Sequence, residues 1–185
     1  MRIIAGTCRG RRLAGLGKGD AAAQLRPTSD RVRESLFSLL EAGYEDPVSG
    51  AQVLDLFAGT GALGLEALSR GAEAATFVEQ GRVALGLLQE NIRRCGLEDR
   101  ARVLRRDARR PGVATGAHDL VFLDPPYARA LGEAALETVL AGGWIAPGAL
   151  IVWEESAPIA PPAALHRLEE RRYGDTRITI LRHGG

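Results

Sequence analysis

The chain has few of the residues that mark secreted, membrane or metal-dependent proteins. It has two cysteines and three histidines in 185 residues, and they are scattered. Cys8 and Cys95 lack the spacing of a disulfide framework or a zinc site, so we expect reduced thiols, no metal and a cytoplasmic protein. No apolar run approaches the roughly 18 residues of a membrane span, and the N-terminus lacks a signal-peptide core.

Acidic residues are scarce at the beginning of the chain. Residues 1–33 hold eight basic residues against two acidic ones, although the net charge of the whole chain is only +1. The rest of the chain is therefore acidic overall. A basic end on an acidic body predicts a polyanionic partner, because lysine and arginine concentrated on one segment attract phosphate.

The length predicts one domain with a proper core. Residues 1–26 are predicted to form a basic extension, made of a β-hairpin and a glycine- and alanine-rich connector. Residues 27–185 are predicted to form the main domain. Its first element is a helix that begins after Pro27, with Thr28 or Ser29 as N-cap, and ends at Gly43.

From residue 51 the pattern becomes an alternation of strands and helices. Strands are predicted at 53–56, 75–78, 101–104, 120–123 and 150–153, and helices at 62–70, about 83–95 and 131–140. The tail is predicted to be a hairpin of strands 168–173 and 177–181. Apolar strands that alternate with helices indicate an α/β fold whose parallel sheet is covered on both faces. A closing antiparallel hairpin departs from the usual dinucleotide-binding arrangement.

A glycine-rich loop follows the first strand and opens a helix. Gly59, Gly61 and Gly64 fit the dinucleotide fingerprint, and Glu79 ends the next strand. A nicotinamide cofactor is therefore one candidate ligand for this loop. However, Asp55 lies just before the loop, where its carboxylate would repel a pyrophosphate and attract the cationic amino group of S-adenosylmethionine. We therefore predict S-adenosylmethionine, with a nicotinamide enzyme as a distant alternative.

Two further acidic residues follow strands and are candidates for cofactor contacts. Glu79 suits two ribose hydroxyls, since charge-assisted hydrogen bonds are strong; its alternative is a solvated helix N-cap. Asp107 follows the third strand and can accept from an adenine amino group. The alternative for Asp107 is a surface acid that pairs with neighbouring arginines.

The motif Asp124-Pro125-Pro126-Tyr127 follows the fourth strand, where its residues would face the glycine loop across one crevice. An exocyclic base amine is a poor nucleophile because its lone pair is delocalised into the ring. The Asp124 side chain and the Pro125 carbonyl can accept its two hydrogens, and Pro126 restrains that carbonyl. Tyr127 offers a face for an unstacked base. These four residues predict an amino-methyltransferase.

These motifs resemble those of the RsmD family of bacterial 16S ribosomal RNA guanine-N2 methyltransferases. The resemblance lies in residues 2–6 and 9–11, 26–37, 55–61, 124–127 and 173–176. It implies the class I S-adenosylmethionine-dependent methyltransferase fold, a Rossmann-like, seven-stranded, mostly parallel sheet with a C-terminal antiparallel hairpin. It also implies methylation of the N2 of guanine 966 in 16S ribosomal RNA, within the small ribosomal subunit and by a monomer.

The resemblance also implies roles for individual residues. The segment 26–33 would pack beside the methionine end of the cofactor, and the N-terminal extension would touch RNA. The cofactor contacts are then Thr28, Arg31, Asp55, Phe57, Gly59, Gly61, Glu79, Asp107, Ala108 and Asp124. The RNA contacts are Arg2, Arg9, Arg11, Arg12, Arg26 and Arg33.

Two other functions are compatible with the motifs. One is an amino-methyltransferase that acts on DNA adenine or cytosine, or on a protein glutamine. A DNA enzyme usually needs a sizeable recognition domain, however, and few residues precede the first core strand. The other is a non-catalytic RNA-binding factor of ribosome assembly with a vestigial cleft, against which the intact Asp55, Glu79 and Asp124 argue.

Overall fold

The computed structural model describes residues 1–15, 29–126 and 131–184. Every helix and strand expected from residue 29 onward in these ranges is present, and β5 begins five residues earlier than expected. In that part of the chain, no helix is long and apolar enough to cross a membrane. The elements are α1 (Asp30–Gly43), β1 (Gln52–Leu56), α2 (Ala62–Ser69), β2 (Ala74–Glu79), α3 (Arg82–Cys95), the short 3-10 helix η1 (Glu98–Arg100), β3 (Ala101–Arg105), β4 (His118–Leu123), α4 (Leu131–Ala141), β5 (Ile145–Glu155), β6 (Leu165–Tyr173) and β7 (Thr176–His183).

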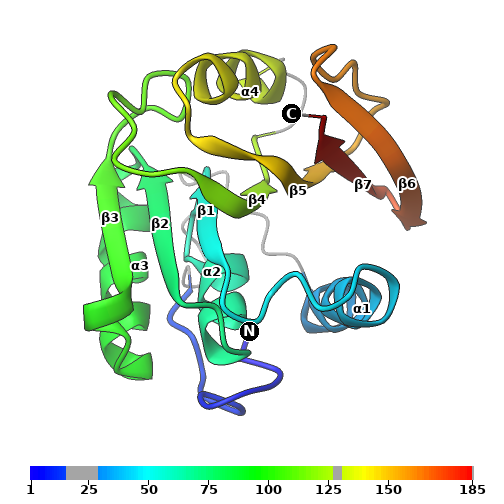
Figure 1. The fold of residues 1–185 in the computed structure, drawn as a ribbon. Coiled ribbons are helices and arrows are strands. Elements are labelled where there is room, and N and C mark those ends of the chain that lie inside the picture. The colour runs from blue at the N-terminus through cyan, green and yellow to red at the C-terminus, as the bar shows by residue number, and fades with distance from the viewer. Residues whose placement is uncertain (16–28, 127–130, 185) are drawn as a thin grey trace.

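One seven-stranded sheet organises the fold, in the order β3-β2-β1-β4-β5-β7-β6 (Figure 1). Strands β1 to β5 pair in parallel, and β7 runs antiparallel between β5 and β6. The strand order reverses between β1 and β4, which is the point where ligands bind in such sheets. This arrangement confirms the predicted class I methyltransferase sheet with its C-terminal hairpin.

The sheet is buried on both faces by two separate hydrophobic clusters. Helices α1, α2 and α3 cover one face, where Phe37 and Leu65 pack with Val53 of β1. Helix α4 covers part of the other face, where Leu136 packs near Leu54 of β1. Successive residues of one strand therefore enter different clusters, which is why the strands have apolar residues at nearly every position.

The helix ends agree with the sequence signals. The Ser29 side chain accepts a hydrogen bond from the Val32 backbone N–H at 3.3 Å, so Ser29 is the N-cap of α1. Thr28, the other candidate, lies outside the described residues. At the end of α3, Gly96 has a φ of 64° and its N–H donates to the Arg93 carbonyl. Glycine adopts this left-handed conformation without a steric penalty.

The N-terminal segment 1–15 folds back on itself, but its predicted hairpin is reduced to a single antiparallel bridge between Arg2 and Arg12. The Thr7 N–H donates to the Ser69 carbonyl at 2.8 Å, at the end of α2. The Cys8 thiol donates to the Cys95 carbonyl at 3.4 Å, at the end of α3. Both helices run back from the carboxyl ends of the strands, so the turn around Thr7 and Cys8 lies at the opposite, amino edge of the sheet (Figure 1). The segment then leads to Ala14, which contacts Asn91 in the middle of α3.

The two cysteines, distant in sequence, meet at this contact. Both are buried and both are free thiols, as expected. Burial, and then the neighbouring Cys8, raise the pKa of Cys95 to about 12. A thiol with so high a pKa is a poor nucleophile. The pair therefore acts as packing between the N-terminal segment and α3.

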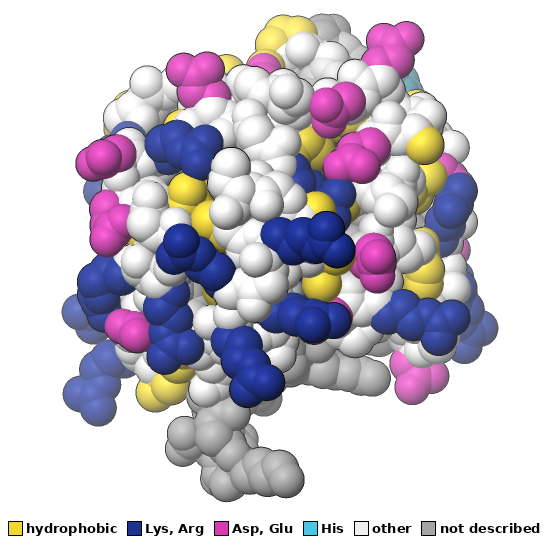
Figure 2. Space-filling model, turned by 90° about the horizontal axis from the view of Figure 1, so that it is seen from below, with side chains coloured by type: hydrophobic (Ala, Val, Ile, Leu, Met, Phe, Trp, Pro, Cys, Tyr) yellow, Lys and Arg dark blue, Asp and Glu magenta, His cyan; other side chains and the backbone are white. Residues whose placement is uncertain are grey.

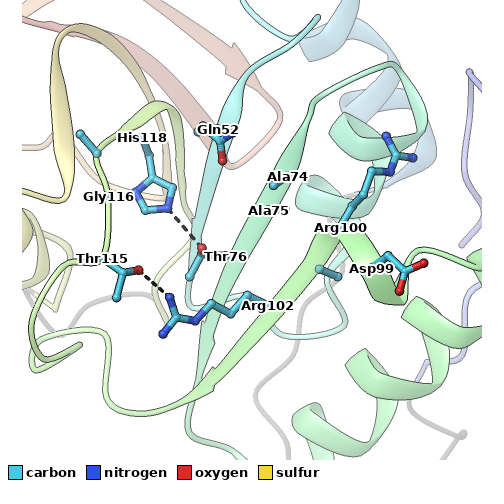
Figure 3. A pocket seen from close by; sticks show the side chains of 12 residues that line it. Gln52, Ala74, Ala75, Thr76, Asp99, Arg100, Arg102, Thr115, Gly116 and His118 are labelled. Carbon is cyan, nitrogen blue, oxygen red and sulfur yellow. Dashed lines mark hydrogen bonds between the residues drawn. The ribbon is translucent and has the colours of Figure 1, made fainter.

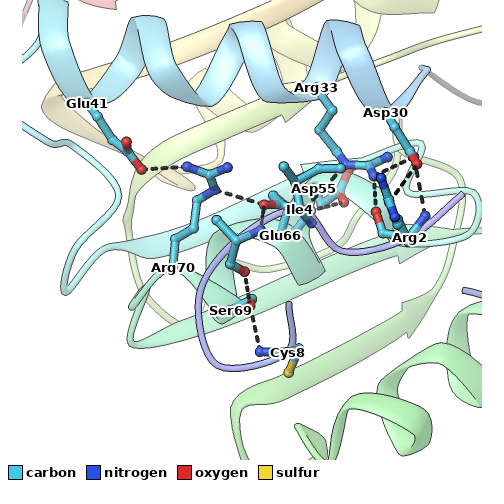
Figure 4. A network of polar contacts seen from close by, with 12 residues as sticks. Arg2, Ile4, Cys8, Asp30, Arg33, Glu41, Asp55, Glu66, Ser69 and Arg70 are labelled. Carbon is cyan, nitrogen blue, oxygen red and sulfur yellow. Dashed lines mark hydrogen bonds and ion pairs between the residues drawn. The ribbon is translucent and has the colours of Figure 1, made fainter. Parts of the chain in front are cut away.

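The prediction that Arg33 contacts RNA is wrong, because its side chain is completely buried. Its guanidinium donates to Asp30 at 3.0 Å and to the Arg2 carbonyl, and it forms an ion pair with Glu66 (Figure 4). The physical reason is helical periodicity. Arg33 lies on the same face of α1 as Leu36 and Leu40, and that face packs on the sheet.

Candidate active site

The structure brings the two predicted motifs together at the carboxyl edge of the sheet. Leu56 of β1 pairs with Leu123 of β4, and these are the last residues of the two strands. The glycine loop starts at Phe57 and the Asp124 motif starts one residue beyond Leu123. The two segments therefore leave neighbouring strands at the same level, at the point where the strand order reverses.

The glycine loop is held in a conformation that side chains would obstruct. Gly61 has a φ of 79°, and a Cβ atom there would lie 2.4 Å from a methyl carbon of Leu88. A Cβ on Gly64 would lie 2.4 Å from the Phe77 ring. Phe57 also has a positive φ, of 60°, which is costly for a residue that is not glycine. The result is a backbone turn that a ligand can approach closely.

Asp55 lies beneath this turn. It is only 2% exposed, and its Oδ2 accepts a hydrogen bond from the Gly64 N–H at 3.0 Å. Burial raises the pKa of Asp55 to about 8, with the Gly64 hydrogen bond opposing the shift and the nearby Glu79 charge adding to it. A cation that enters the crevice would stabilise the ionised form of Asp55.

Glu79 ties the glycine loop to the start of α3. One carboxylate oxygen accepts from the Gly59 N–H at 2.8 Å, and the other accepts from Gln80 at 2.8 Å and Gly81 at 2.6 Å. Gly81 is the N-cap residue of α3 and α3 has no side-chain cap hydrogen bond, so Glu79 holds the turn before the helix and is not its N-cap. A carboxylate offers about four lone-pair sites, and the remaining capacity suits a ribose hydroxyl.

Asp107 is engaged by a neighbouring arginine. Its Oδ2 lies 2.6 Å from Nη2 of Arg109, and the Arg109 Nε contacts both carboxylate oxygens. The side-chain hydrogen bonds from Arg109 lower the pKa of Asp107. The surface ion pair weighed from the sequence is thus present, and an adenine amino group would share this carboxylate with Arg109. Ala108 is buried beside it in the core under α4.

Asp124 is half-buried, Pro125 is buried and Pro126 is half-buried. Burial raises the pKa of Asp124 well above its usual range, and the charges of Glu154, Asp55 and Glu155 add to the effect.

The predicted site residues Tyr127, Thr28 and Arg26 lie outside the described residues. Arg31 is exposed on the first turn of α1.

Glu154 is a site residue that the sequence reasoning missed. It follows Trp153, which pairs with Leu123, so Glu154 stands beside Asp124. It is only 5% exposed. The sequence contains a signal for Glu154, since the apolar run of β5 ends in an acidic residue.

Within residues 1–15, 29–126 and 131–184, no His, Cys, Asp and Glu side chains are grouped as metal ligands would be.

Four of the arginines predicted to bind RNA are exposed on the N-terminal segment. Arg2 is 66% exposed, and Arg9, Arg11 and Arg12 are exposed as well. Arg11 donates to the Arg94 carbonyl at the end of α3. Seen from the amino edge, Lys and Arg side chains gather on the surface, with acidic side chains between them (Figure 2). A phosphate backbone that binds here contacts the protein away from the crevice.

A hollow of about 380 Å³ also lies at the amino edge (Figure 3). Arg102 of β3 donates there to Thr115, and the His118 ring contacts the Thr76 hydroxyl at 3.2 Å. The hollow lies where the short connection between β3 and β4 leaves the sheet without a covering helix. Ligands of such sheets bind at the carboxyl ends of the strands, so this hollow is separate from the cofactor crevice.

Comparison with known proteins identifies the family. A model of the family described as conserved hypothetical protein 95 matches residues 1–182. Ribosomal RNA small subunit methyltransferase D of Escherichia coli is 40% identical over 173 residues, which cover 90% of this chain and 83% of that protein. Its counterpart in Haemophilus influenzae is 36% identical over 181 residues, which cover 94% of this chain and 89% of that protein.

Solved structures agree with these relatives. The structure of yhhF from Escherichia coli superposes with a TM-score of 0.83 at 38% identity, covering 100% of this chain and 98% of that one. Protein TTHA0928 of Thermus thermophilus superposes with a TM-score of 0.74 at 34% identity, covering 97% and 98%. The match extends from the N-terminal segment to the C-terminal hairpin, and the chain therefore belongs to the RsmD family, described as conserved hypothetical protein 95.

Proposed function

We propose that this chain is an S-adenosylmethionine-dependent methyltransferase that modifies the exocyclic N2 of a guanine in 16S ribosomal RNA, at the position of the guanine-966 type. The observation that carries the proposal is the pairing of Leu56 with Leu123, which sets Asp124 and Pro125 beside the glycine loop. The names of the relatives, ribosomal RNA small subunit methyltransferase D, support the substrate class.

The residues of the crevice fit the cofactor. When bound, S-adenosylmethionine supplies an electrophilic methyl group on a positively charged sulfur. The turn at Gly59 and Gly61 leaves room for close approach of a ligand to the backbone. Glu79 keeps acceptor capacity for ribose hydroxyls, and Asp55 offers a carboxylate to a cationic amino group. Asp107 and Ala108 follow β3, where they would meet the adenine end.

Asp124 and Pro125 would orient the amino group of the base. The Asp124 carboxylate and the Pro125 carbonyl accept the two N–H hydrogens, which draws the nitrogen lone pair out of conjugation with the ring. The nitrogen then points its lone pair at the methyl group, and positioning supplies most of the rate. A strong general base is not required, because the nitrogen becomes acidic only after it has been methylated.

The N-terminal arginines would hold the RNA rather than the target base. Arg11 donates to the Arg94 carbonyl at the end of α3, and three residues later the Ala14 N–H donates to Asn91 Oδ1 at 2.6 Å. Asn91 in turn donates to the Thr60 carbonyl of the glycine loop at 2.9 Å, so the basic segment leads from the amino edge toward the crevice. Its arginines would bind phosphates that neighbour the target base. This geometry supports a structured substrate such as the small subunit. We propose that the chain acts there as a monomer, in the bacterial cytoplasm.

Nucleoside mass spectrometry tests the function directly. A strain that lacks the gene should lose one N2-methylguanosine from its 16S ribosomal RNA, and the wild-type gene should restore it. A gene with Asp124→Ala should not restore it, although the protein accumulates normally. Unchanged N2-methylguanosine in the deletion strain would rule out this substrate and favour DNA or a protein glutamine, which the same enzyme preparation can then be offered.

A further inference from the structure

One buried side chain, that of Asn91 in the middle of α3, joins the N-terminal segment to the glycine loop. Asn91 is completely buried. Its Oδ1 accepts a hydrogen bond from the Ala14 N–H at 2.6 Å, and its Nδ2 donates to the Ala14 carbonyl at 3.1 Å. The same Nδ2 donates to the Thr60 carbonyl of the glycine loop at 2.9 Å. Two segments that are distant in sequence therefore share one amide group.

These contacts use the full donor capacity of the Asn91 amide. A side-chain amide has two N–H donors, and here one serves Ala14 and the other serves Thr60. If the amide were turned over, its oxygen would face both carbonyls. A single orientation therefore satisfies both segments. A movement of either segment that turns the amide leaves a buried group of the other segment without its hydrogen bond, which costs free energy.

Thr60 is held between the cofactor site and α3. The residue before it, Gly59, donates to Glu79, which is the residue proposed for the ribose hydroxyls. The residue after it, Gly61, packs on Leu88 one turn before the amide, so closely that a Cβ atom would lie 2.4 Å from the Leu88 methyl carbon. A ligand that fixes this turn therefore also fixes the direction of the Thr60 carbonyl.

Ala14 is equally close to the exposed arginines of the N-terminal segment. Arg12, two residues earlier, is exposed, and its carbonyl accepts from Arg94 of α3 at 3.3 Å. Arg11 is exposed as well and donates to the Arg94 carbonyl. This stretch of the segment therefore lies along α3 as far as the amide. Phosphate bound at Arg11 or Arg12 would hold the backbone that Ala14 continues.

We propose that Asn91 is a positioning residue that couples RNA binding at the N-terminal segment to cofactor binding at the glycine loop. The proposal rests on the proposed function, which supplies the two ligands. A bound cofactor fixes the loop and leaves the Asn91 amide in the orientation that Ala14 requires, so less ordering remains for RNA to induce. The effect is reciprocal, because each ligand must change the affinity for the other by the same factor.

The test compares binding of small subunits that lack the modification, with and without saturating S-adenosylhomocysteine. This demethylated product is used because it has no methyl group to transfer. In the wild-type protein the product should tighten binding of the subunits about fivefold or more. Asn91→Ala removes all three hydrogen bonds, and Asn91→Asp keeps the acceptor for Ala14 but loses both donors. Both variants should reduce the factor to less than about twofold.

Ser69→Ala is the matched control. The Ser69 Oγ accepts from the Cys8 N–H at 2.9 Å and donates to the Ala5 carbonyl at 2.5 Å, so it holds the same segment at the end of α2, away from the glycine loop. Ser69→Ala should lower stability and keep the wild-type coupling factor. If Asn91→Ala also lowers stability but keeps that factor, Asn91 is merely structural and the proposal is overturned.

Hydrogen exchange in the wild-type protein decides the matter if the Asn91 variants do not fold. The product should slow exchange of the Ala14 N–H, whose acceptor is Asn91, and not that of the Thr7 N–H, whose acceptor is the Ser69 carbonyl. Equal effects on the two N–H groups, or no effect on either, overturn the proposal. A wild-type protein that binds neither the product nor the subunits would defeat the proposed function itself, whereas binding of both without coupling defeats only this inference.

Discussion

Arg33 of α1 and Glu66 of α2 form an ion pair in which neither side chain is exposed, with Nε and Oε2 3.5 Å apart (Figure 4). Glu66 also accepts from the backbone N–H groups of Ile4 at 2.8 Å and Ala5 at 3.0 Å, and from Arg70 at 2.8 Å. One carboxylate thus joins the N-terminal segment to both helices. A buried carboxylate is tolerated only when it is paired in this way.

Loss of Glu66 should therefore be severe. Glu66→Ala removes one of the two carboxylates that pair with the buried Arg33 charge, together with the acceptor of Ile4, Ala5 and Arg70, and should lower the free energy of unfolding by about 3–5 kcal/mol. Urea denaturation measures the change. Glu90→Ala removes an exposed carboxylate that pairs with Arg93 and Arg94 and should have no measurable effect. Equal stability of the two variants would show that the network does not hold the N-terminal segment.

Glu79→Ala should weaken binding of S-adenosylmethionine at least about tenfold, the lower end for losing charge-assisted hydrogen bonds. The variant should also melt at a lower temperature, because the N–H groups of Gly59 and Gly81 lose their acceptor. Calorimetry and thermal unfolding separate the two effects. Glu73→Ala, an exposed residue just before β2, is the control. Wild-type affinity in Glu79→Ala would show that Glu79 does not bind the cofactor.

Asp55→Asn should change how stability depends on pH. The pKa of Asp55 is about 8 in the folded protein, against 3.8 ordinarily, so the folded state retains a proton that the unfolded state loses. Stability should then fall as the pH rises between about 4 and 8, by up to about 1.4 kcal/mol for each pH unit. Asp55→Asn should reduce that slope and stabilise the protein at pH 8. Asp124 titrates in the same direction, so part of the slope should remain.

Urea denaturation at pH 5 and at pH 8 measures this difference. The variant should gain stability at pH 8 and little at pH 5, while it loses affinity for S-adenosylmethionine. Such a result would mean that Asp55 is kept for binding at the expense of stability. Parallel pH curves for the variant and the wild-type protein would contradict the raised pKa.

Replacement of Arg9, Arg11 and Arg12 by alanine should make RNA binding less sensitive to salt. Each lost phosphate contact should reduce the slope of log K against log salt by about 0.7–0.9. Affinity for S-adenosylmethionine should not change, because these side chains are exposed on the N-terminal segment, where Arg11 contacts the end of α3. A triple variant with the same loss of charge on β6, at Arg167, Arg171 and Arg172, is the control. Equal salt slopes for the two variants would show that the N-terminal arginines are solvated surface residues that do not contact the RNA phosphates.

Asp124→Ala should reduce kcat by about 10²–10³, as expected for losing one hydrogen-bond partner of the transition state. Asp124→Asn should lose less, since its amide oxygen still accepts a hydrogen bond. Single-turnover methylation of small subunits that lack the modification measures the rate, with cofactor affinity measured in parallel. Methylation by Asp124→Ala at the wild-type rate would refute the hydrogen-bond mechanism. The stacking role of Tyr127 is predicted from the sequence alone. Tyr127→Phe should leave kcat nearly unchanged, because stacking needs only the aromatic ring.

Much of the fold followed from local signals. The apolar runs of β1, β4 and β5, the Ser29 cap and the Gly96 stop are properties of short segments, and each was found at its expected place. The crevice followed as well, because both motifs come directly after strands, and the carboxyl ends of parallel strands share one edge. The amino acid sequence by itself thus determined the order of elements, the cofactor loop and the position of Asp124.

Tertiary packing decided the rest. Arg33 carries the charge of an RNA-binding residue, but the face of α1 on which it lies is buried, where Glu66 and Asp30 make its charge tolerable. Glu154 became a neighbour of Asp124 through the register of β4 with β5, which joins residues about thirty positions apart. The turn around Cys8 was set at the amino edge by its contact with the end of α3. Helical periodicity sets Arg33 on the apolar face of α1, but the partners of its charge, the register of β4 with β5 and the docking of the N-terminal segment are set by contacts between distant segments.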